Sequence, residues 1–440
     1  MGGTSGCSSR RASESGGSVA DLRTEIREWL GEQWSPDLTL REWWGRLAGA
    51  GFAYPHFPKG YGGLGLSAAD SRIVQEELTA AGAVSAPFGL GQIMGAPVVL
   101  DHGTDEQRDA WVLRLASGLE SWCQLFSEPG AGSDLASSST RAVQDGDVWI
   151  VNGQKVWTSG AQVADRGMLV ARTNVDNPKH RGLTYFIIDM DQPGIEVRPL
   201  KQMNGASHFN EVFFNDAVVG DDRVISSVND GWMVAVATLA YERQGLTQGG
   251  RGGTPAGTPG EKAGLLDRAC GELLARAGAE QSQMAMNQRT RSSAALRELA
   301  AEQGRAGDAV IRQRLAAHHA LSETQRLSGL RARAAAQRGK QPGPAVSTAK
   351  LAASELGRRS RDLAMEVLGP AGMLDGDDAP HGGAFQSMAL SVQSSSIAGG
   401  TDEIQRNIIG ERVLGLPKEP QVDRDVPFKE LRTGTQRSQP

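Results

Sequence analysis

The sequence has few cysteines and no long uninterrupted hydrophobic segment. Its three cysteines, Cys7, Cys123 and Cys270, are spaced neither as a disulfide framework nor as a zinc site, and a reducing compartment fits them. The longest apolar stretches, such as Ile93 to Leu100, are far shorter than the roughly 20 residues that a membrane-spanning helix needs. No charged-then-apolar leader opens the chain, so we expect a cytoplasmic protein that does not enter membranes.

The chain also lacks an excess of basic charge. The 46 Lys and Arg residues are outnumbered by 51 Asp and Glu residues, which gives a net charge of -5. Without a basic stripe, nucleic acid is not expected as the main partner. With 39% hydrophobic residues, the 440-residue chain can bury a core divided among two or three structural units.

The composition changes twice along the chain. Helical spacing of apolar residues runs through Val19 to Leu30, Arg41 to Ala50 and Ser67 to Ala81. From about Glu120, short β-rich runs are separated by turn residues. These runs are Val148 to Val151, Gly167 to Arg172, Leu183 to Asp189, Ile195 to Pro199 and Glu211 to Phe214.

Helical composition returns from Gly231 onward. We expect helices over Glu261 to Ala277, Ala309 to Gln337 and Pro344 to Leu368, with a flexible connection over Gln248 to Gly260. The predicted fold class is α+β. Its predicted parts are a disordered tail (1–18), a helical domain (19–120), a middle β domain (121–232), a helical bundle (233–417) and a polar, disordered tail (418–440).

One glycine motif matches a dinucleotide-binding pattern but lacks the strand that should precede it. Residues Gly60 to Gly65 read GYGGLG and fit the G-x-G-x-x-G pattern of dinucleotide-binding folds. Pro55 and Pro58, however, stand where a buried parallel strand should precede that motif. A turn leading into a helix at Ser67 is the better interpretation.

The most informative segment is QLFSEPGAGSD, which spans Gln124 to Asp134, followed by Trp157, Thr158 and Ser159. A Gly-Ala-Gly turn exposes backbone N–H groups of the kind that a pyrophosphate requires, and Ser133 adds a hydroxyl. Trp157 offers a flat apolar face that suits an isoalloxazine ring. Taken singly, a glycine turn or a tryptophan is common in β domains.

Together, at this spacing, these residues resemble the acyl-CoA dehydrogenase family. The resemblance implies an N-terminal α-helical domain, a middle β barrel and a C-terminal four-helix bundle, with bound FAD. Cofactor contacts in the β domain are implied for Gln124, Phe126, Ser127, Gly132, Ser133, Trp157, Thr158 and Ser159.

The resemblance covers roughly Val19 to Pro417. Leu368 to Gly372, LGPAG, resembles the glycine turn that meets FAD across a subunit boundary, and Ser396 to Leu416 resembles the final helix of the family. Further cofactor contacts are thereby implied for Arg305, Gly369, Thr401 and Glu403, and substrate contacts for Ser133, Arg243, Gly399 and Gly400.

The resemblance also locates the catalytic base. Oxidation of a thioester needs a base for the α proton and a donor for the developing enolate oxygen. Much of the family places a glutamate before Gly-Thr in the final helix, but here that position is Gly399, which retains only its N–H. Some members carry the glutamate on the first bundle helix, followed by arginine, and Glu242-Arg243 matches that pattern. Glu242 is therefore the predicted base.

Alternatives to that assignment remain. Glu242 can be an ordinary surface glutamate or an ion-pair partner of Arg243, and Asp402 and Glu403 are weaker base candidates that can simply be helix-start residues.

The family pattern also has departures that bear on assembly. Residues 304–314 keep Arg305 but lack the phenylalanine of the Arg-x-x-Phe motif, and about 274–302 is longer than usual. Expected partners are an acyl-CoA substrate, an electron-transfer flavoprotein as electron acceptor, and a homodimer, a homotetramer or a heterotetramer with a related subunit. A second hypothesis is a non-catalytic or half-catalytic subunit, and a third is an oxidase, a monooxygenase or a DNA-associated relative on the same fold.

Overall fold

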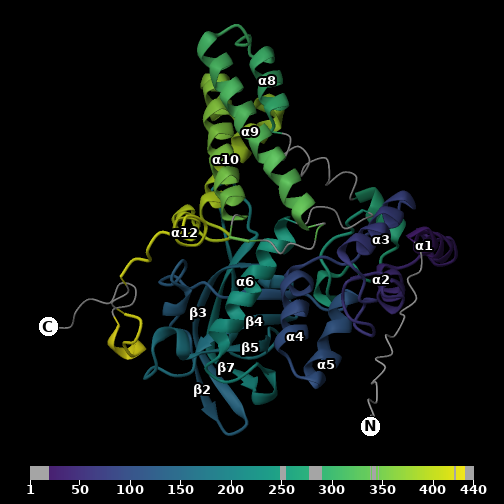
Figure 1. The fold of residues 1–440 in the computed structure, drawn as a ribbon, viewed down its shortest axis with the longest axis vertical. Helices are drawn as coiled ribbons and strands as arrows, with labels where there is room; N and C mark the ends of the chain where they lie inside the picture. The colour runs from purple at the N-terminus through teal and green to yellow at the C-terminus, as the bar shows by residue number, and fades with distance from the viewer. Residues whose placement is uncertain are drawn as a thin grey trace, which may run out of the picture.

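The computed structural model describes residues 19–247, 254–276, 290–336, 338, 343–344, 346–420 and 423–431. It contains helices, then a β domain, then helices (Figure 1), and this order confirms the predicted fold class. The tail 1–18, predicted to be disordered, lies outside the described residues. Within the described ranges, no helix is both long and apolar enough to cross a membrane.

The N-terminal domain is a group of helices around a tryptophan-rich core. The helices are α1 (Val19–Gln33), α2 (Leu40–Gly49), α3 (Ala68–Ala80), α4 (Ala96–His102) and α5 (Asp105–Ala116). Thr39 begins α2 with a capping box, in which its hydroxyl and the Glu42 carboxylate satisfy each other's backbone N–H groups. Trp43 and Trp44 are fully buried, and their indole N–H groups each donate to a backbone carbonyl 2.8 Å away.

The GYGGLG motif forms a turn between α2 and α3. Residues 60–65 contain no strand, and Ser67 caps the helix that follows by accepting a hydrogen bond from the Asp70 N–H. The interpretation of this motif as a turn is therefore confirmed.

The middle domain is one eight-stranded sheet that surrounds a core of its own. Its strands are β1 (Trp122–Leu125), β2 (Arg141–Asp145), β3 (Val148–Ser159), β4 (Arg166–Arg172), β5 (Leu183–Asp189), β6 (Ile195–Leu200), β7 (Phe209–Gly220) and β8 (Val224–Ile225). The strand order is β6-β7-β3-β2-β4-β5-β8, and β1 pairs parallel to β4. Side chains from β1 to β5 and from β7 meet inside.

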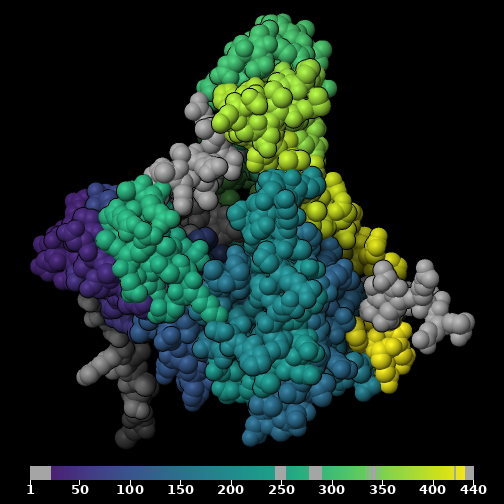
Figure 2. Space-filling model, turned by 180° about the vertical axis from the view of Figure 1, so that it is seen from behind, coloured from purple at the N-terminus to yellow at the C-terminus, as the bar shows by residue number. Residues whose placement is uncertain are grey.

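The C-terminal part begins with α6 (Gly231–Thr247), which packs on β5 and α4 rather than on the later helices. Gly231 allows this close approach, because a Cβ there would stand 2.5 Å from the Thr184 carbonyl carbon. The remaining helices are α8 (Ser293–Glu302), α9 (Ala309–Ala336), α10 (Val346–Leu368), α11 (Ala384–Ser391) and α12 (Asp402–Ile408). Helices α8 to α11 share a separate apolar core and project from the rest of the molecule (Figures 1 and 2).

Two local expectations differ from the structure. The helix expected over residues 261–277 begins only at Cys270, because Gly264 adopts φ +67° and the segment hydrogen-bonds to α2 through the Leu266 and Arg268 carbonyls instead. Residues 423–431, expected to be disordered, lie against the β domain. The expected connection 248–260 falls partly outside the described residues, as does the longer stretch 274–302, and the domain bounds remain predictions.

Candidate active site

The segment QLFSEP leads from β1 to a buried ion pair. Lys155 is fully buried on β3, and its ammonium donates to the Phe126 carbonyl at 2.9 Å and to the Glu128 carboxylate at 2.8 Å. The Val156 N–H also donates to the Ser127 carbonyl at 2.8 Å. These bonds fix the chain after β1 against the strand that carries Trp157 to Ser159, so two predicted cofactor segments lie side by side.

Trp157 projects from an irregularity in β3. The register of β3 against β7 shifts between Lys155 and Thr158, and Trp157 adopts φ +62°, which a bulky residue rarely does. Its side chain is 60% exposed and contacts Phe209 edge-to-face at 5.9 Å. The bulge therefore turns a large aromatic face away from the core, where a planar ligand can lie on it.

Two buried polar atoms beside Trp157 have no hydrogen-bond partner among the described residues. They are Oγ1 of Thr158 and Oδ1 of Asn210, and both residues are fully buried. Asn210 uses its amide N–H groups on the Thr158 carbonyl at 2.9 Å and on Gln162 at 2.7 Å. Unsatisfied buried polar atoms are costly, so they favour a polar ligand at this point.

The GAGSD turn is exposed at its centre. Gly132 and Ser133 are exposed, and a Cβ at Gly132 would meet no atom within 4 Å. Within the same turn, the Ala131 and Glu128 backbones are bonded to each other, and Glu128 accepts hydrogen bonds from the Ser139 and Thr140 N–H groups. Hydrogen bonds thus fix the flanks of the turn, whereas its tip at Gly132 and Ser133 is open. Gln124 is partly exposed, whereas Phe126 is buried against Tyr185, so its backbone is the part nearest the other candidates.

Glu242 lies near the end of α6 and is half-buried. Its neighbour Tyr241 donates a short hydrogen bond to Asp101 of α4, and the Thr238 hydroxyl, one turn earlier, donates to the Tyr185 hydroxyl at 3.3 Å. These bonds attach α6 to α4 and to the β domain. The helix that carries the predicted base is therefore held over the sheet. The Arg243 side chain lies outside the described ones.

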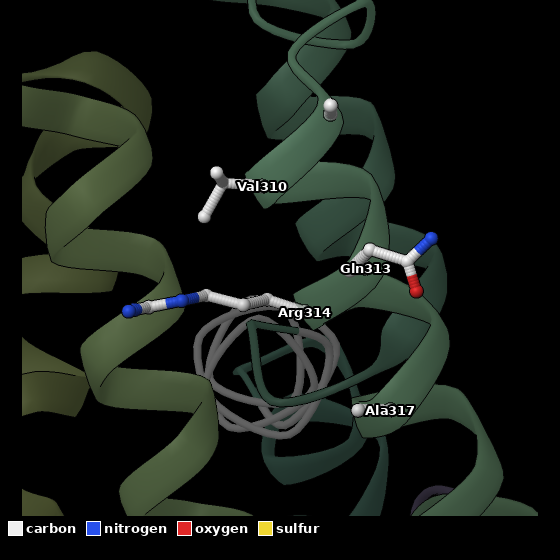
Figure 3. Close-up of a pocket in the computed structure, with 5 residues that line it drawn as sticks. Val310, Gln313, Arg314 and Ala317 are labelled. Atoms are coloured by element: carbon white, nitrogen blue, oxygen red, sulfur yellow. The ribbon is translucent and has the colours of Figure 1, made fainter.

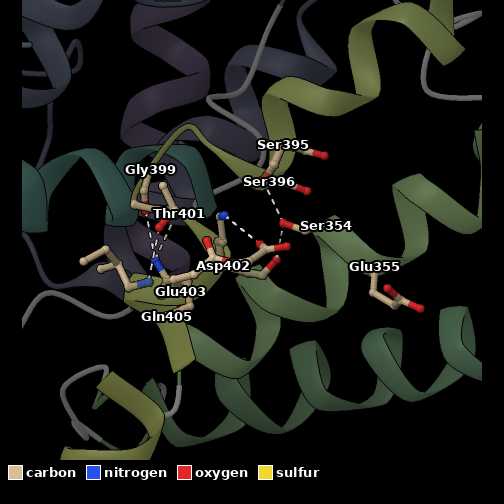
Figure 4. A network of polar contacts seen from close by, with 12 residues as sticks. Ser354, Glu355, Ser395, Ser396, Gly399, Thr401, Asp402, Glu403 and Gln405 are labelled. Atoms are coloured by element: carbon tan, nitrogen blue, oxygen red, sulfur yellow. Dashed lines mark hydrogen bonds and ion pairs between the residues drawn. The ribbon is translucent and has the colours of Figure 1, made fainter. Parts of the chain in front are cut away.

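The glycine turn before α12 is built by a polar network (Figure 4). Gly399 and Gly400 adopt φ +66° and +84°, and the Gln405 amide donates to both of their carbonyls at 3.0 and 3.3 Å. Thr401 caps α12 by accepting from the Ile404 N–H. A Cβ at Gly399 would meet no atom within 4 Å, so the turn has open space where much of the family carries its base.

Two carboxylates near this turn already have cationic partners. Asp402 is buried and bound by Arg358 at 2.6 Å and by Lys350 at 3.2 Å. Burial raises its pKa, but the hydrogen bond from Arg358, together with those from Ser354 and Lys350, outweighs burial and lowers the pKa of Asp402 to about 2. The Glu403 side chain is 76% exposed and pairs with Arg406. Both fit the interpretation as helix-start residues better than that of a base.

Arg305 and Gly369 lie together at one end of the projecting helices. Arg305 donates to the Glu366 carbonyl near the end of α10 and to Asp308 at 2.9 Å, and Gly369 follows α10 with φ +53°. An open hollow of about 470 Å³ follows on α9 (Figure 3), with the Arg314 side chain extended toward Glu366. The hollow is lined by Ala309, Val310, Gln313, Arg314 and Ala317. Among the residues that the structure describes, no hydrogen bond or ion pair joins Arg305 or Gly369 to the β-domain candidates.

Family models match the chain in three consecutive segments. Residues 19–119 match the acyl-CoA dehydrogenase N-terminal domain, 123–217 the middle domain and 269–414 the C-terminal domain. The chain is 35% identical over 427 residues to acyl-CoA dehydrogenase IpdE1 of Mycobacterium tuberculosis, covering 91% of this chain and 98% of that protein. This chain belongs to the acyl-CoA dehydrogenase family.

Solved structures of related acyl-CoA dehydrogenases are also similar. A chain of the ChsE4-ChsE5 complex from Mycobacterium tuberculosis matches with a TM-score of 0.62 and 30% identity, over 93% of this chain and 100% of that one. A chain of the Tcur3481-Tcur3483 steroid ACAD matches with a TM-score of 0.65 and 25% identity, over 91% of this chain and 98% of that one.

Members of the acyl-CoA dehydrogenase family typically bind FAD, and the residues present fit that group. The exposed Trp157 face suits a flavin ring, the unpartnered oxygens of Thr158 and Asn210 suit its polar edge, and the open Gly132 turn suits a pyrophosphate. Sequence reasoning missed Lys155 and Asn210, which hold these segments in place. Their signal was faint: both are polar residues at inward positions of strands that otherwise bury apolar side chains.

Proposed function

We propose that this acyl-CoA dehydrogenase family member binds FAD and oxidises the α,β carbon–carbon bond of an acyl-CoA thioester, with Glu242 as the base. Glu242 would take the α proton, and the Gly399 N–H would donate to the thioester carbonyl as charge develops on its oxygen. The bound flavin supplies an acceptor for the hydride from the β carbon. An electron-transfer flavoprotein is the proposed acceptor for the electrons.

The assignment of the base is supported by the state of the other carboxylates. Gly399 has no acidic group, Asp402 is committed to Arg358 and Lys350, and Glu403 points into solvent. Glu242 is half-buried on a helix that hydrogen bonds attach to the β domain. The match of Glu242-Arg243 to the family's alternative position for the base is the observation that favours Glu242 most strongly.

The proposed substrate is a branched, long or bulky acyl group. The open space at Gly399 supports this, because a substrate can occupy the volume that a glutamate side chain fills elsewhere. Similarity to the solved steroid ACAD supports a polycyclic acyl group in the same way.

The proposal is tested with the purified chain alone. Its visible flavin absorbance is followed without oxygen while straight-chain, branched and polycyclic acyl-CoA thioesters are added. Bleaching by any thioester supports the dehydrogenase half-reaction and begins to define the acyl group. A colourless protein, or a yellow one that no thioester bleaches, contradicts activity of the chain alone.

A second function has its own supporting observation. Arg305 and Gly369 lie apart from the β-domain candidates, and similar solved structures include a ChsE4-ChsE5 complex. A flavin site completed by another chain explains that separation. We therefore keep, as the alternative, a subunit of a hetero-oligomer that completes a partner's flavin site, and pull-down of a related chain that restores bleaching would favour it.

A further inference from the structure

The chain returns to the β domain after its last long helix. The Phe428 N–H donates to the Asn177 carbonyl at 2.9 Å, and the Lys429 N–H donates to the Val175 carbonyl at 3.0 Å. We call residues 423–431 the C-terminal strap. Its atoms lie on the surface of the β domain, coloured yellow in Figure 2. The strap contacts the loop between β4 and β5, which carries both of these acceptors.

Two strap side chains contact buried cations. The Phe428 ring lies over the Arg172 guanidinium, 3.8 Å from its central carbon, and the Asp423 carboxylate accepts from the Lys179 ammonium at 2.7 Å. Arg172 is only 2% exposed, and burial lowers its pKa to about 10. A desolvated guanidinium gains more from an aromatic face than an exposed one does. The strap therefore covers two cations of the β domain, one with an aromatic ring and the other with a carboxylate.

The same two cations hold the last residue of the GAGSD turn and the residues that follow it. Lys179 also donates to Asp134 at 3.0 Å. Arg172 donates to the carbonyls of Ala136 and Ser138, the latter at 3.2 Å. Each cation thus bridges the strap and the segment immediately after Gly132 and Ser133.

The β4–β5 loop extends this connection to α6. His180, next to Lys179, contacts the Trp232 ring edge-to-face at 4.9 Å, near the start of the helix that carries Glu242. The loop therefore contacts the strap, the GAGSD turn and α6, the helix that carries Glu242. A change at the strap can reach both halves of the proposed site through a single loop.

We propose that the C-terminal strap is a positioning element for the GAGSD turn. Phe428 acts through Arg172, and Asp423 acts through Lys179, to hold Asp134 and the following turn in the arrangement that presents the Gly132 and Ser133 backbone. Its role toward FAD and thioester rests on the proposed function, whereas its hold on the turn does not. Phe428 and Asp423 are positioning residues, since neither contacts the open tip.

Hydrogen–deuterium exchange tests the hold on the turn without any ligand. Phe428→Ala and Asp423→Asn are expected to speed exchange of the Ser137 and Ser138 amides at least tenfold, because their bonds within the turn lose support. Phe428→Tyr keeps the ring face and is expected to restore slow exchange. Lys429→Met is the matched control, because its ion pair with Asp176 is exposed and touches neither cation.

Titration of the apoprotein with FAD adds a second readout. The dissociation constant is expected to rise about five- to twentyfold in Phe428→Ala and Asp423→Asn, and to stay unchanged in Lys429→Met.

Three results would overturn the inference. One is a turn whose exchange is unchanged although the strap's own amides exchange freely in Phe428→Ala. Another is equally accelerated exchange in α8, which would indicate global destabilisation. The third is unchanged FAD affinity with a loosened turn. Failure of all thioesters to bleach the flavin would instead contradict the proposed function and leave the exchange result standing.

Discussion

Single residues decide where the chemistry of this protein can take place. Gly399 lacks the carboxylate that much of the acyl-CoA dehydrogenase family uses, and the two acidic residues that follow it are held by arginine or lysine partners. Glu242 occupies a different element, and its half-buried position leaves part of its side chain accessible. The proposed base, Glu242, is therefore separable by mutation from the turn at Gly399.

Glu242→Gln is expected to retain flavin and to lower the rate of anaerobic flavin reduction by about 10²- to 10⁴-fold, since it removes proton abstraction with little change in shape. Stopped-flow absorbance with a substrate that bleaches the wild type measures the rate. Glu403→Gln tests the alternative base and should lower the rate far less than Glu242→Gln does. Near-normal flavin reduction in Glu242→Gln, with a loss in Glu403→Gln, would instead identify Glu403 as the base.

Lys155 gives a second prediction at this scale, for stability. Lys155→Met leaves the buried Glu128 carboxylate without its cation and is expected to lower the free energy of unfolding by about 3–5 kcal/mol. Chemical denaturation followed by tryptophan fluorescence measures this. Adding Glu128→Gln to Lys155→Met removes the stranded charge, so the double variant should regain part of the loss; an equal or larger loss would show that the pair is not the cause.

Whole elements were predicted well where the apolar spacing was regular. The expected helix 309–337 matches α9 (Ala309–Ala336), and the expected helix 344–368 matches α10 (Val346–Leu368). The helix expected over residues 261–277 is wrong in its first half, because backbone bonds to α2 compete with helical bonds there. The strap was missed for the same reason. Its order comes from contacts with Arg172 and Lys179, and Lys179 lies 244 residues before its partner Asp423. Local composition cannot reveal contacts over such a distance in the sequence.

The residues of the site show the same limit. The motif around Trp157 predicts a cofactor-binding strand, but neither the bulge nor the φ of +62° follows from alternation of apolar residues. The separation of Arg305 from the β domain depends on how the helices pack in three dimensions, and only the family resemblance, which places the Gly369 turn across a subunit boundary, pointed to it.

The packing of α8, α9 and α10 depends on a buried histidine. His318 is 1% exposed, and its ring nitrogens lie 2.8 Å from the Ser293 hydroxyl and 2.9 Å from the Ser360 hydroxyl. Burial lowers the pKa of His318, and the nearby cations Arg359 and His319 lower it further. The imidazole therefore favours its neutral form in the folded bundle.

The stability of these helices is accordingly expected to depend on pH. Because the folded pKa lies below the unfolded value of about 6.5, the contribution is present above that pH and is lost as the pH falls toward the folded pKa. Hydrogen–deuterium exchange of the α8 amides should become faster as the pH falls from 7 to 5, once the rates are corrected for the intrinsic pH dependence of amide exchange. His318→Gln should flatten this dependence. The exposed His319→Gln should change it only slightly, because His319 is the smallest of the three causes that lower the pKa of His318. The same slope in all three proteins would contradict the role of His318.

At the scale of the whole molecule, one chain leaves many large apolar side chains in solvent. In the C-terminal part, these exposed apolar side chains include Val310, Leu327, Leu330, Met373, Leu374, Leu390, Ile397, Val413, Leu414 and Leu416. A large exposed apolar area on a monomer favours association with another chain. Together with the separated cofactor residues, it favours an assembly in which another chain covers the projecting helices.

Light scattering after size-exclusion chromatography is expected to give a mass of at least twice the 46.6 kDa of one chain. Leu327→Glu combined with Leu330→Glu should lower that mass, because both leucines are exposed on α9, whereas Leu113→Glu on α5 should not. A wild-type mass of 46.6 kDa would contradict self-association and leave a different chain as the partner.

The turn at Gly399 also offers an opportunity for protein engineering. Because no atom lies within 4 Å of a Cβ at that position, only the left-handed backbone resists a side chain there, and asparagine and aspartate tolerate that conformation best. A small library at position 399 would therefore test stepwise whether this position borders the acyl group, as proposed, while Glu242 stays unchanged. Because the proposed function also gives the Gly399 N–H a role at the thioester carbonyl, such a library would probe acyl preference and donation to that carbonyl together.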